Sequence, residues 1–136
     1  MKKQTKNIIL YSIFTLLISS AVFCFFNKHA MQNTQQQKTY KTYTSKALID
    51  DLKKESFESL TEKTIEVNGT LKKIHKKNNK HTLYLSDNIN DTYILCELQN
   101  NQLHKLPNLK IGHLVKVKGV FKGHLVDLIL LNCIIK

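Results

Sequence analysis

From Thr64 to the end of the chain, apolar residues repeatedly alternate with polar ones, and this pattern constrains the fold more than any other feature. The alternation occurs in five segments: 64–74, 81–86, 92–98, 113–121 and 125–135. Successive side chains of a strand point to opposite faces, so a period of two predicts strands with one apolar face. The last segment is almost wholly apolar, as in a strand buried on both faces. Five short strands favour a small closed barrel, because an open sheet would leave its edges exposed.

An amphipathic helix is expected directly before the barrel, from Ser45 to about Leu60. Ser45 is a suitable N-cap, and apolar residues follow it near helical spacing. These residues are Ala47, Leu48, Leu52, Phe57 and Leu60. A helix this short needs a surface to pack on, so we expect it to lie against the barrel. Residues 100–112, between the third and fourth strands, leave room for one further short helix or turn.

The N-terminal segment predicts the location of the chain. Residues 8–26 are 19 consecutive residues without a charge, about 28 Å as a helix and close to the roughly 30 Å hydrocarbon core of a bilayer. Lysines before this run favour a cytoplasmic N-terminus. We therefore expect residues 1–26 to be a basic flank and a single-pass anchor in the cell membrane. The C-terminal domain would then be extracytoplasmic, in the periplasm or at the cell surface.

Two other interpretations of the same segment remain open, and both also export the rest of the chain. Ser19, Ser20 and Ala21 are small residues suited to cleavage by a signal peptidase. Cys24 suggests a lipoprotein, although bulky Val22 and Phe23 precede it. The polar, glutamine-rich residues 27–44 are expected to form a flexible linker, with a reach of about 24 Å. Tyr40 and Tyr43, at its end, are expected to fasten it to the barrel.

The residues from 45 to 136 resemble the tRNA anticodon-binding-like (tRNA_anti-like) family of OB folds. The matching features are Glu66–Gly69 in the first strand, Cys96 in the third, Gly112 with Val115–Gly119, and Asn132–Cys133 near the end. The resemblance implies a mostly β protein: a five-stranded OB-fold barrel, preceded by a short helix and by an exported N-terminal segment. Most of these positions are structural, so the family name does not by itself establish tRNA binding.

A cluster of lysines is the first candidate for a binding site. The chain has 21 lysines, no arginine and a net charge of +11, which favours polyanionic partners. Five of the lysines fall in the expected loop between the first two strands: Lys72, Lys73, Lys76, Lys77 and Lys80. This loop borders the usual ligand face of an OB fold, where the cations can meet phosphates or anionic headgroups. The alternative is a solvated hairpin tip whose charge opposes aggregation. The absence of arginine argues against bidentate recognition of guanine or phosphate.

Two tyrosines and two cysteines complete the candidate residues. Tyr84 and Tyr93 are expected on the outer face of the second and third strands, where OB folds stack the bases of single strands. Cys96 and Cys133 lie on strands that are neighbours in an OB barrel. In an oxidising compartment we expect them to form a disulfide, worth about 4 kcal/mol on the chain-entropy estimate. The alternative is a pair of buried free thiols.

No cofactor, metal site or catalytic activity is expected from the sequence. The six histidines show no metal-ligand spacing, and the carboxylates have no paired base or nucleophile. Asp127, a lone acid among apolar residues, is expected to hydrogen-bond the neighbouring turn.

The sequence therefore supports three hypotheses of function. The first is a membrane-anchored, non-enzymatic OB-fold module that binds an envelope protein, a glycan or another polyanion. The second is a domain that binds single-stranded nucleic acid. The third is a structural envelope protein.

Overall fold

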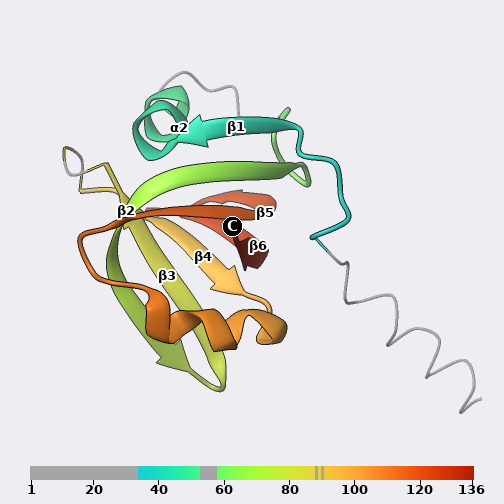
Figure 1. Cartoon of the computed structure of the whole chain (residues 1–136). Helices are drawn as coiled ribbons and strands as arrows, with labels where there is room; N and C mark the ends of the chain where they lie inside the picture. Colours follow the sequence, from blue (N-terminus) through green and yellow to red (C-terminus); the bar gives the residue numbers. More distant parts are fainter. Residues whose placement is uncertain (1–33, 53–57, 88, 90) are drawn as a thin grey trace, which may run out of the picture. The chain divides into compact units, whose positions relative to one another are not determined.

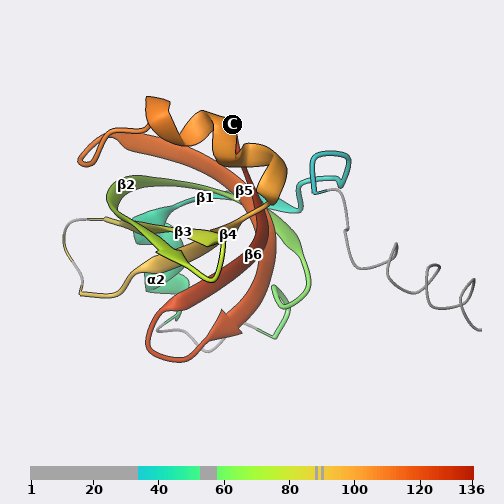
Figure 2. The ribbon, with the colours of Figure 1, turned by 90° about the horizontal axis from the view of Figure 1, so that it is seen from below.

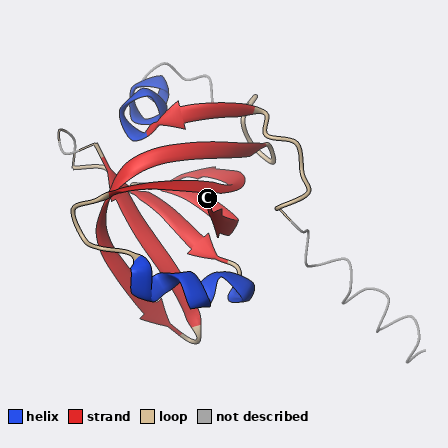
Figure 3. Ribbon diagram, in the orientation of Figure 1, coloured by secondary structure: helices blue, strands red, loops and turns tan. Residues whose placement is uncertain are grey.

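The protein is described by a computed structural model that covers residues 34–52, 58–87, 89 and 91–136 (Figure 1). The elements in chain order are β1 (Lys41–Thr44), α2 (Ser45–Leu52), β2 (Thr64–Lys77), β3 (Lys80–Ser86), β4 (Ile94–Leu98), the 3-10 helix η1 (Asn100–Asn108), β5 (Leu114–His124) and β6 (Leu128–Ile135). Strands dominate the described chain, as Figure 3 shows.

The strand β2 is long enough to pair with two different neighbours, and this closes the barrel. Its residues 64–70 pair antiparallel with β5, and its residues 70–77 pair antiparallel with β3. The pairings β3–β4, β4–β6 and β6–β5 complete the ring, with β4 and β6 parallel. Figure 2 shows these strands running around a common interior. The five-stranded barrel expected from the alternation is confirmed.

The core fills the inside of this ring and takes residues from all five barrel strands. The fully buried ones are Ile65, Val67, Leu71, Leu83, Leu85, Ile94, Cys96, Val117, Phe121, Leu128, Leu130 and Cys133. Those on β2, β3, β4 and β5 occupy the inward positions of the predicted alternation. The last strand was expected to be buried on both faces from residue 125, but β6 begins only at Leu128, and Leu125 and Val126 before it are exposed. A β-carbon at Gly119 would clash with Sγ of Cys133, so glycine is required where the register of β5 shifts against β6.

A sixth strand, β1, lies next to β2 and was not expected. Lys41–Thr44 pair in parallel with residues 65–68 of β2, and Tyr43 is buried in the core. The sequence analysis placed these residues at the end of a linker because four residues are too few to show a strand period. Burial of Tyr43 agrees with its expected role in fastening this segment, whereas Tyr40 is 58% exposed.

Residues 34–40, here called the strap, also lie against the barrel. The Thr39 hydroxyl donates to Glu66 Oε1 at 3.0 Å, and the side-chain amide of Gln99 donates to the Thr34 hydroxyl at 3.1 Å. The backbone carbonyl of Gln37 accepts a hydrogen bond from the buried Lys118 ammonium. The described part of the expected linker is therefore held by polar contacts rather than extending freely from the barrel.

The helix α2 follows β1 directly and packs Leu48 and Ile49 into the core. The Thr44 hydroxyl accepts a hydrogen bond from the Ala47 N–H at 3.1 Å. The N-cap is therefore Thr44 and not Ser45, because the helix starts one residue earlier than the sequence suggested. The described helix ends at Leu52. The predicted continuation, including Phe57, falls on residues 53–57 and lies outside the described residues.

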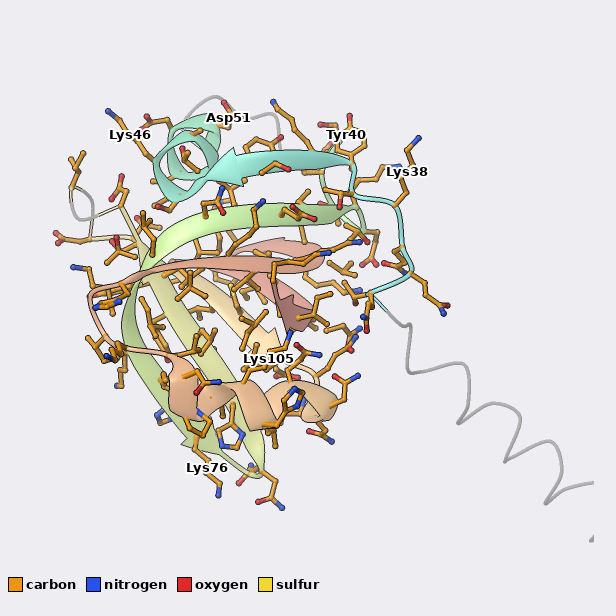
Figure 4. The ribbon with its side chains drawn as sticks, in the orientation of Figure 1. Lys38, Tyr40, Lys46, Asp51, Lys76 and Lys105 are labelled. Carbon is orange, nitrogen blue, oxygen red and sulfur yellow. The ribbon has the colours of Figure 1, made fainter. Side chains whose placement is uncertain are left out.

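The helix η1 fills the expected connector and is fixed to the end of β6. Gln102 Oε1 accepts a hydrogen bond from the Ile135 N–H at 3.1 Å, and the Lys105 ammonium donates to the Ile135 carbonyl at 2.6 Å (Figure 4). Leu106 and Leu109 pack against the core. The polar connector predicted from the sequence is thus a helix that holds the last strand.

The predicted membrane anchor, residues 8–26, lies outside the described residues. Within the part of the chain that the structure describes, no helix combines the length and the apolar character needed to cross a bilayer.

Candidate functional site

All five candidate lysines lie on strands and not in a loop, which corrects the sequence interpretation. Lys72, Lys73, Lys76 and Lys77 belong to β2, and Lys80 begins β3. The turn between the strands is only Asn78–Asn79, and both residues have positive φ, 49° and 60°. Such a two-residue turn matches the twist of a hairpin, and asparagine tolerates the conformation. The predicted strand ended too early, at residue 74, because the lysines beyond it gave no apolar–polar alternation.

The strand register divides the lysines between two faces of the hairpin. Lys73 pairs with Tyr84 and Lys77 pairs with Lys80, so these side chains share the outer face with Tyr84. Lys76 pairs with His81 on the opposite face, near the hairpin tip in Figure 4. Lys72 is the additional residue of a bulge between Leu71 and Lys73. The candidate lysines therefore do not form one cluster.

Three aromatic rings meet on this outer face, and we call them, together with Lys73, the aromatic face. The Tyr84 ring contacts the Tyr93 ring edge to face, with centroids 5.8 Å apart, and the His75 ring with centroids 6.5 Å apart. Lys73 Nζ lies 5.5 Å from the Tyr84 centroid, within the range of a cation–π contact. The structure thus brings into contact Tyr84 and Tyr93, which were both expected on the outer face, and adds His75.

Tyr93 is held in place by the turn between β5 and β6. Its backbone N–H donates to Asp127 Oδ1 at 2.8 Å, and its carbonyl accepts from the Leu128 N–H at 3.0 Å. The Asp127 carboxylate therefore accepts a hydrogen bond from the residue just before β4, and not from the neighbouring turn as the sequence suggested. Through this bond the β5–β6 turn and the aromatic face are fixed to each other. The turn also carries Leu125 and Val126, which are 86% and 85% exposed.

Apolar side chains extend the aromatic face across the sheet. Tyr84 pairs with Leu95 of β4, and Leu95 pairs with Ile129 of β6, so the three side chains form one row on the outer surface. Leu95 and Ile129 are half-buried. The face therefore offers flat apolar area at its centre, with cations along the hairpin beside it.

The charge of the hairpin is only partly compensated. Lys80 Nζ lies 2.8 Å from Glu97 Oε1, and both side chains are accessible to water. An exposed ion pair of this kind contributes about 0–1 kcal/mol. No ion pair is found for Lys73 or Lys77 among the described residues. The outer face therefore presents net positive charge next to its rings.

Cys96 and Cys133 are fully buried free thiols in the barrel core. Burial raises the pKa of the Cys133 thiol well above 9.0, and its hydrogen bond with Cys96 raises the pKa further. The register places Cys133 opposite Leu98 and Cys96 opposite Leu130, so the two cysteines are diagonal neighbours on parallel strands. The disulfide expected from the sequence stays a prediction.

Histidines do not gather with other ligands in the part of the chain that the structure describes, where no group of three or more metal-binding side chains occurs. His81 Nδ1 is buried without a hydrogen-bond partner among these residues. His75 is the functional candidate that the sequence analysis missed. Extending the period of two beyond Ile74 places His75 on the same face as Lys73 and Lys77, and this was the signal that could have found it.

Known structures resemble the barrel to different degrees. A candidate nucleic-acid-binding lipoprotein from Klebsiella pneumoniae is 13% identical, with a TM-score of 0.61 over 70% of this chain and 90% of that chain. The S. pombe Stn1–Ten1 complex is 16% identical, with a TM-score of 0.43 over 51% of this chain and 53% of that chain. RecG bound to a three-way DNA junction is 18% identical, with a TM-score of 0.47 over 74% and 13%. The likeness to the lipoprotein shows the fold alone, and at TM-scores below 0.5 the other two likenesses support no conclusion.

The family assignment comes from the sequence of nearly the whole chain. No curated protein is similar enough in sequence to count as a relative. The tRNA_anti-like family model, in contrast, matches residues 1–135. This agrees with the closed barrel, the helix before it and the resemblance noted in residues 45–136. The chain belongs to the tRNA_anti-like family of OB-fold proteins.

Proposed function

We propose that this protein is an OB-fold module that binds single-stranded nucleic acid on its aromatic face, without catalysing a reaction. The observation that carries the proposal is the row formed by His75, Tyr84 and Tyr93, with Lys73 beside it. The sequence alone ranked an envelope protein, a glycan or another polyanion first. The rings favour single-stranded nucleic acid, because its unpaired bases can stack on them while its phosphates meet the lysines beside them.

Stacking of bases on the aromatic face is the first expected source of affinity. Every nucleobase has a flat face, and stacking of one base on an aromatic side chain contributes about 1–3 kcal/mol. Among the three rings, Tyr93 is 37% exposed. The half-buried Leu95 side chain lies next to Tyr84 and enlarges the apolar surface. A duplex keeps its bases stacked inside, so this surface suits unpaired bases.

Attraction between the lysines and the phosphate backbone is the second expected source of affinity. Lys73, Lys77 and Lys80 share the face of Tyr84 and can neutralise backbone phosphates. A lysine ammonium acts on phosphate as a point charge and does not read a base edge in the bidentate way of arginine. We therefore expect binding that tolerates many sequences. The fold shared with a candidate nucleic-acid-binding lipoprotein supports this proposal.

The test uses the full chain in lipid nanodiscs and a fluorescent oligothymidylate about 15 nucleotides long, within the site sizes of single OB folds. Fluorescence anisotropy measures the Kd. Tyr84→Ala is expected to raise the Kd about 5- to 100-fold, the equivalent of one lost stacking contact. Tyr40→Ala removes a tyrosine that is 58% exposed on the β1 side and serves as the matched control.

Salt dependence tests the role of the lysines. Lys77→Gln is expected to reduce the slope of log Kd against log salt by about 0.7, the value for one phosphate contact on a single strand. Lys38→Gln replaces an exposed lysine of the strap, labelled in Figure 4, and is the control that is expected to leave the slope unchanged. An unchanged Kd for Tyr84→Ala would overturn the proposal. If heparin then bound equally well to both proteins, an envelope polyanion would be the ligand instead.

We also propose that residues 8–26 anchor the protein in the cell membrane with the barrel outside the cytoplasm. The support is the uncharged apolar run and the lysines before it. A C-terminal alkaline phosphatase fusion, which is active only outside the cytoplasm, tests the orientation against a C-terminal green fluorescent protein fusion. Phosphatase activity is the expected result. Fluorescence alone would place the barrel in the cytoplasm and leave the nucleic-acid proposal intact.

A further inference from the structure

A second surface of the barrel contains an open pocket of about 470 Å³. It lies on the outer side of β2 and β5, next to the start of α2, and shares no residue with the aromatic face. The side chains that matter for its chemistry are Thr44, Lys46, Asn68, Asp87, Leu114 and Lys116. Lys46 is visible beside α2 in Figure 4. The volume is in the range of pockets that hold small ligands.

The charges around this pocket cancel, in contrast to those of the hairpin. Lys46 and Lys116 contribute two positive charges, and Asp87 contributes one negative charge. Glu66, beside the pocket, lies 3.6 Å from the Lys116 ammonium and contributes another negative charge. These four groups sum to zero, whereas the whole chain has a net charge of +11. A polyanion therefore gains no particular attraction at this pocket.

The pocket has hydrogen-bonding groups but no aromatic lining. The half-buried side chain of Asn68 makes no hydrogen bond to any residue that the structure describes, so its amide can both donate and accept. The Thr44 hydroxyl accepts from the Ala47 N–H and still has its own proton to donate. Leu114 is 79% exposed at the rim. A flat aromatic ligand finds no stacking partner in such a site.

We infer that the pocket binds one unit of an uncharged saccharide. A sugar ring carries several hydroxyl groups that donate and accept at once, which matches the amide, hydroxyl, ammonium and carboxylate groups of the lining. Its C–H face matches the single exposed leucine at the rim. The pocket is open, so the unit can belong to a longer glycan. This inference goes beyond the proposed nucleic-acid binding and does not depend on it.

Tryptophan fluorescence tests the inference, because the natural chain contains no tryptophan. Leu114→Trp places a single reporter at the rim, and Leu125→Trp places one at the similarly exposed β5–β6 turn as the control. The full-chain variants are titrated in lipid nanodiscs with maltotriose and with chitotriose, without sugar-based detergents. A saturable change for at least one trisaccharide is expected from Leu114→Trp and none from Leu125→Trp.

Loss of the Asn68 amide tests the contact itself. Adding Asn68→Ala to Leu114→Trp is expected to raise the Kd at least about fivefold, the effect of one lost hydrogen bond. Circular dichroism and thermal denaturation establish that this variant keeps the fold, so that a raised Kd reports the lost contact. The inference is overturned if neither trisaccharide changes the fluorescence up to tens of millimolar, or if both reporters respond equally. Tighter binding of an acidic trisaccharide than of a neutral one would also overturn it.

Discussion

The two outer surfaces of this barrel share the strand β2 but differ in their chemistry. The second half of β2 lies beside β3 and contributes Lys73 and His75 to the aromatic face. The first half lies between β1 and β5 and contributes Asn68 and Glu66 to a surface where charges cancel. One long strand therefore supplies two faces, because its neighbours change along its length. Substitutions that affect one face and spare the other test this division.

A substitution in the core that both faces share is expected to cause the largest loss of stability. It should affect ligand binding at both faces alike. Phe121 is fully buried on β5, and Phe121→Ala is expected to lower the free energy of unfolding by about 3–5 kcal/mol. Urea denaturation followed by circular dichroism measures it. Both ligand sites should weaken together at temperatures where the variant is partly unfolded. Full stability of the variant would contradict the assignment of this core.

The core was also the part of the fold best predicted from the sequence, and the reason is physical. Inward positions such as Leu83 and Leu85 must be apolar because they are buried, and this requirement produces the alternation of apolar and polar residues in the sequence. β1 left no comparable trace, because only Tyr43 of its four residues is buried. Its position depends on the free edge of β2, which is a property of the assembled barrel.

The candidate site was predicted less completely than the fold. Tyr84 and Tyr93 follow from the alternation, but their contact depends on pairing between strands that are distant in sequence. His75 was not predicted as a site residue, because the lysines on both sides of it led to the prediction of a loop. The pocket beside α2 combines residues from β1, α2, β2, β5 and the chain after β3, so no local pattern indicates it.

The second prediction concerns the two buried thiols and distinguishes the reduced core from one with a Cys96–Cys133 disulfide. Burial raises the pKa of Cys133 in the folded state, so the unfolded chain releases that proton first as the pH rises. The reduced protein is therefore expected to keep its full stability below about pH 9. Above that pH it should lose up to about 1.4 kcal/mol per pH unit through this thiol.

Urea denaturation at several pH values measures this dependence, with Cys133→Ala as the control for titration of the many lysines. In a protein isolated with the Cys96–Cys133 disulfide the Cys133 thiol is absent, so the pH dependence should match the slope of the control. Its mass should fall by two hydrogens relative to the reduced form. An unchanged mass after reduction would exclude the disulfide, and equal slopes for the reduced protein and Cys133→Ala would contradict the raised pKa.

The third prediction concerns the aromatic face alone. Asp127→Ala removes the acceptor of the Tyr93 N–H and is expected to weaken oligothymidylate binding about fivefold, since this hydrogen bond is worth about 1 kcal/mol. Asp127→Asn keeps an oxygen in the same position and should restore most of the affinity. Fluorescence anisotropy measures both variants. If Asp127→Asn were as weak as Asp127→Ala, the carboxylate would act through its charge and not by positioning Tyr93.

The smallest effect is expected on the other side of β2, at the strap. The side chain of Gln37 accepts a hydrogen bond from the Thr64 hydroxyl, which fixes the strap over the first half of β2. Gln37→Ala is expected to lower the free energy of unfolding by about 0.5–1 kcal/mol, or the Tm by a few degrees. Thermal denaturation measures this change. Because the strap contacts residues of the neutral surface and not the aromatic rings, the Kd for oligothymidylate should stay the same. A change in that Kd would show that the two faces of β2 are coupled through the strand and do not act as separate surfaces.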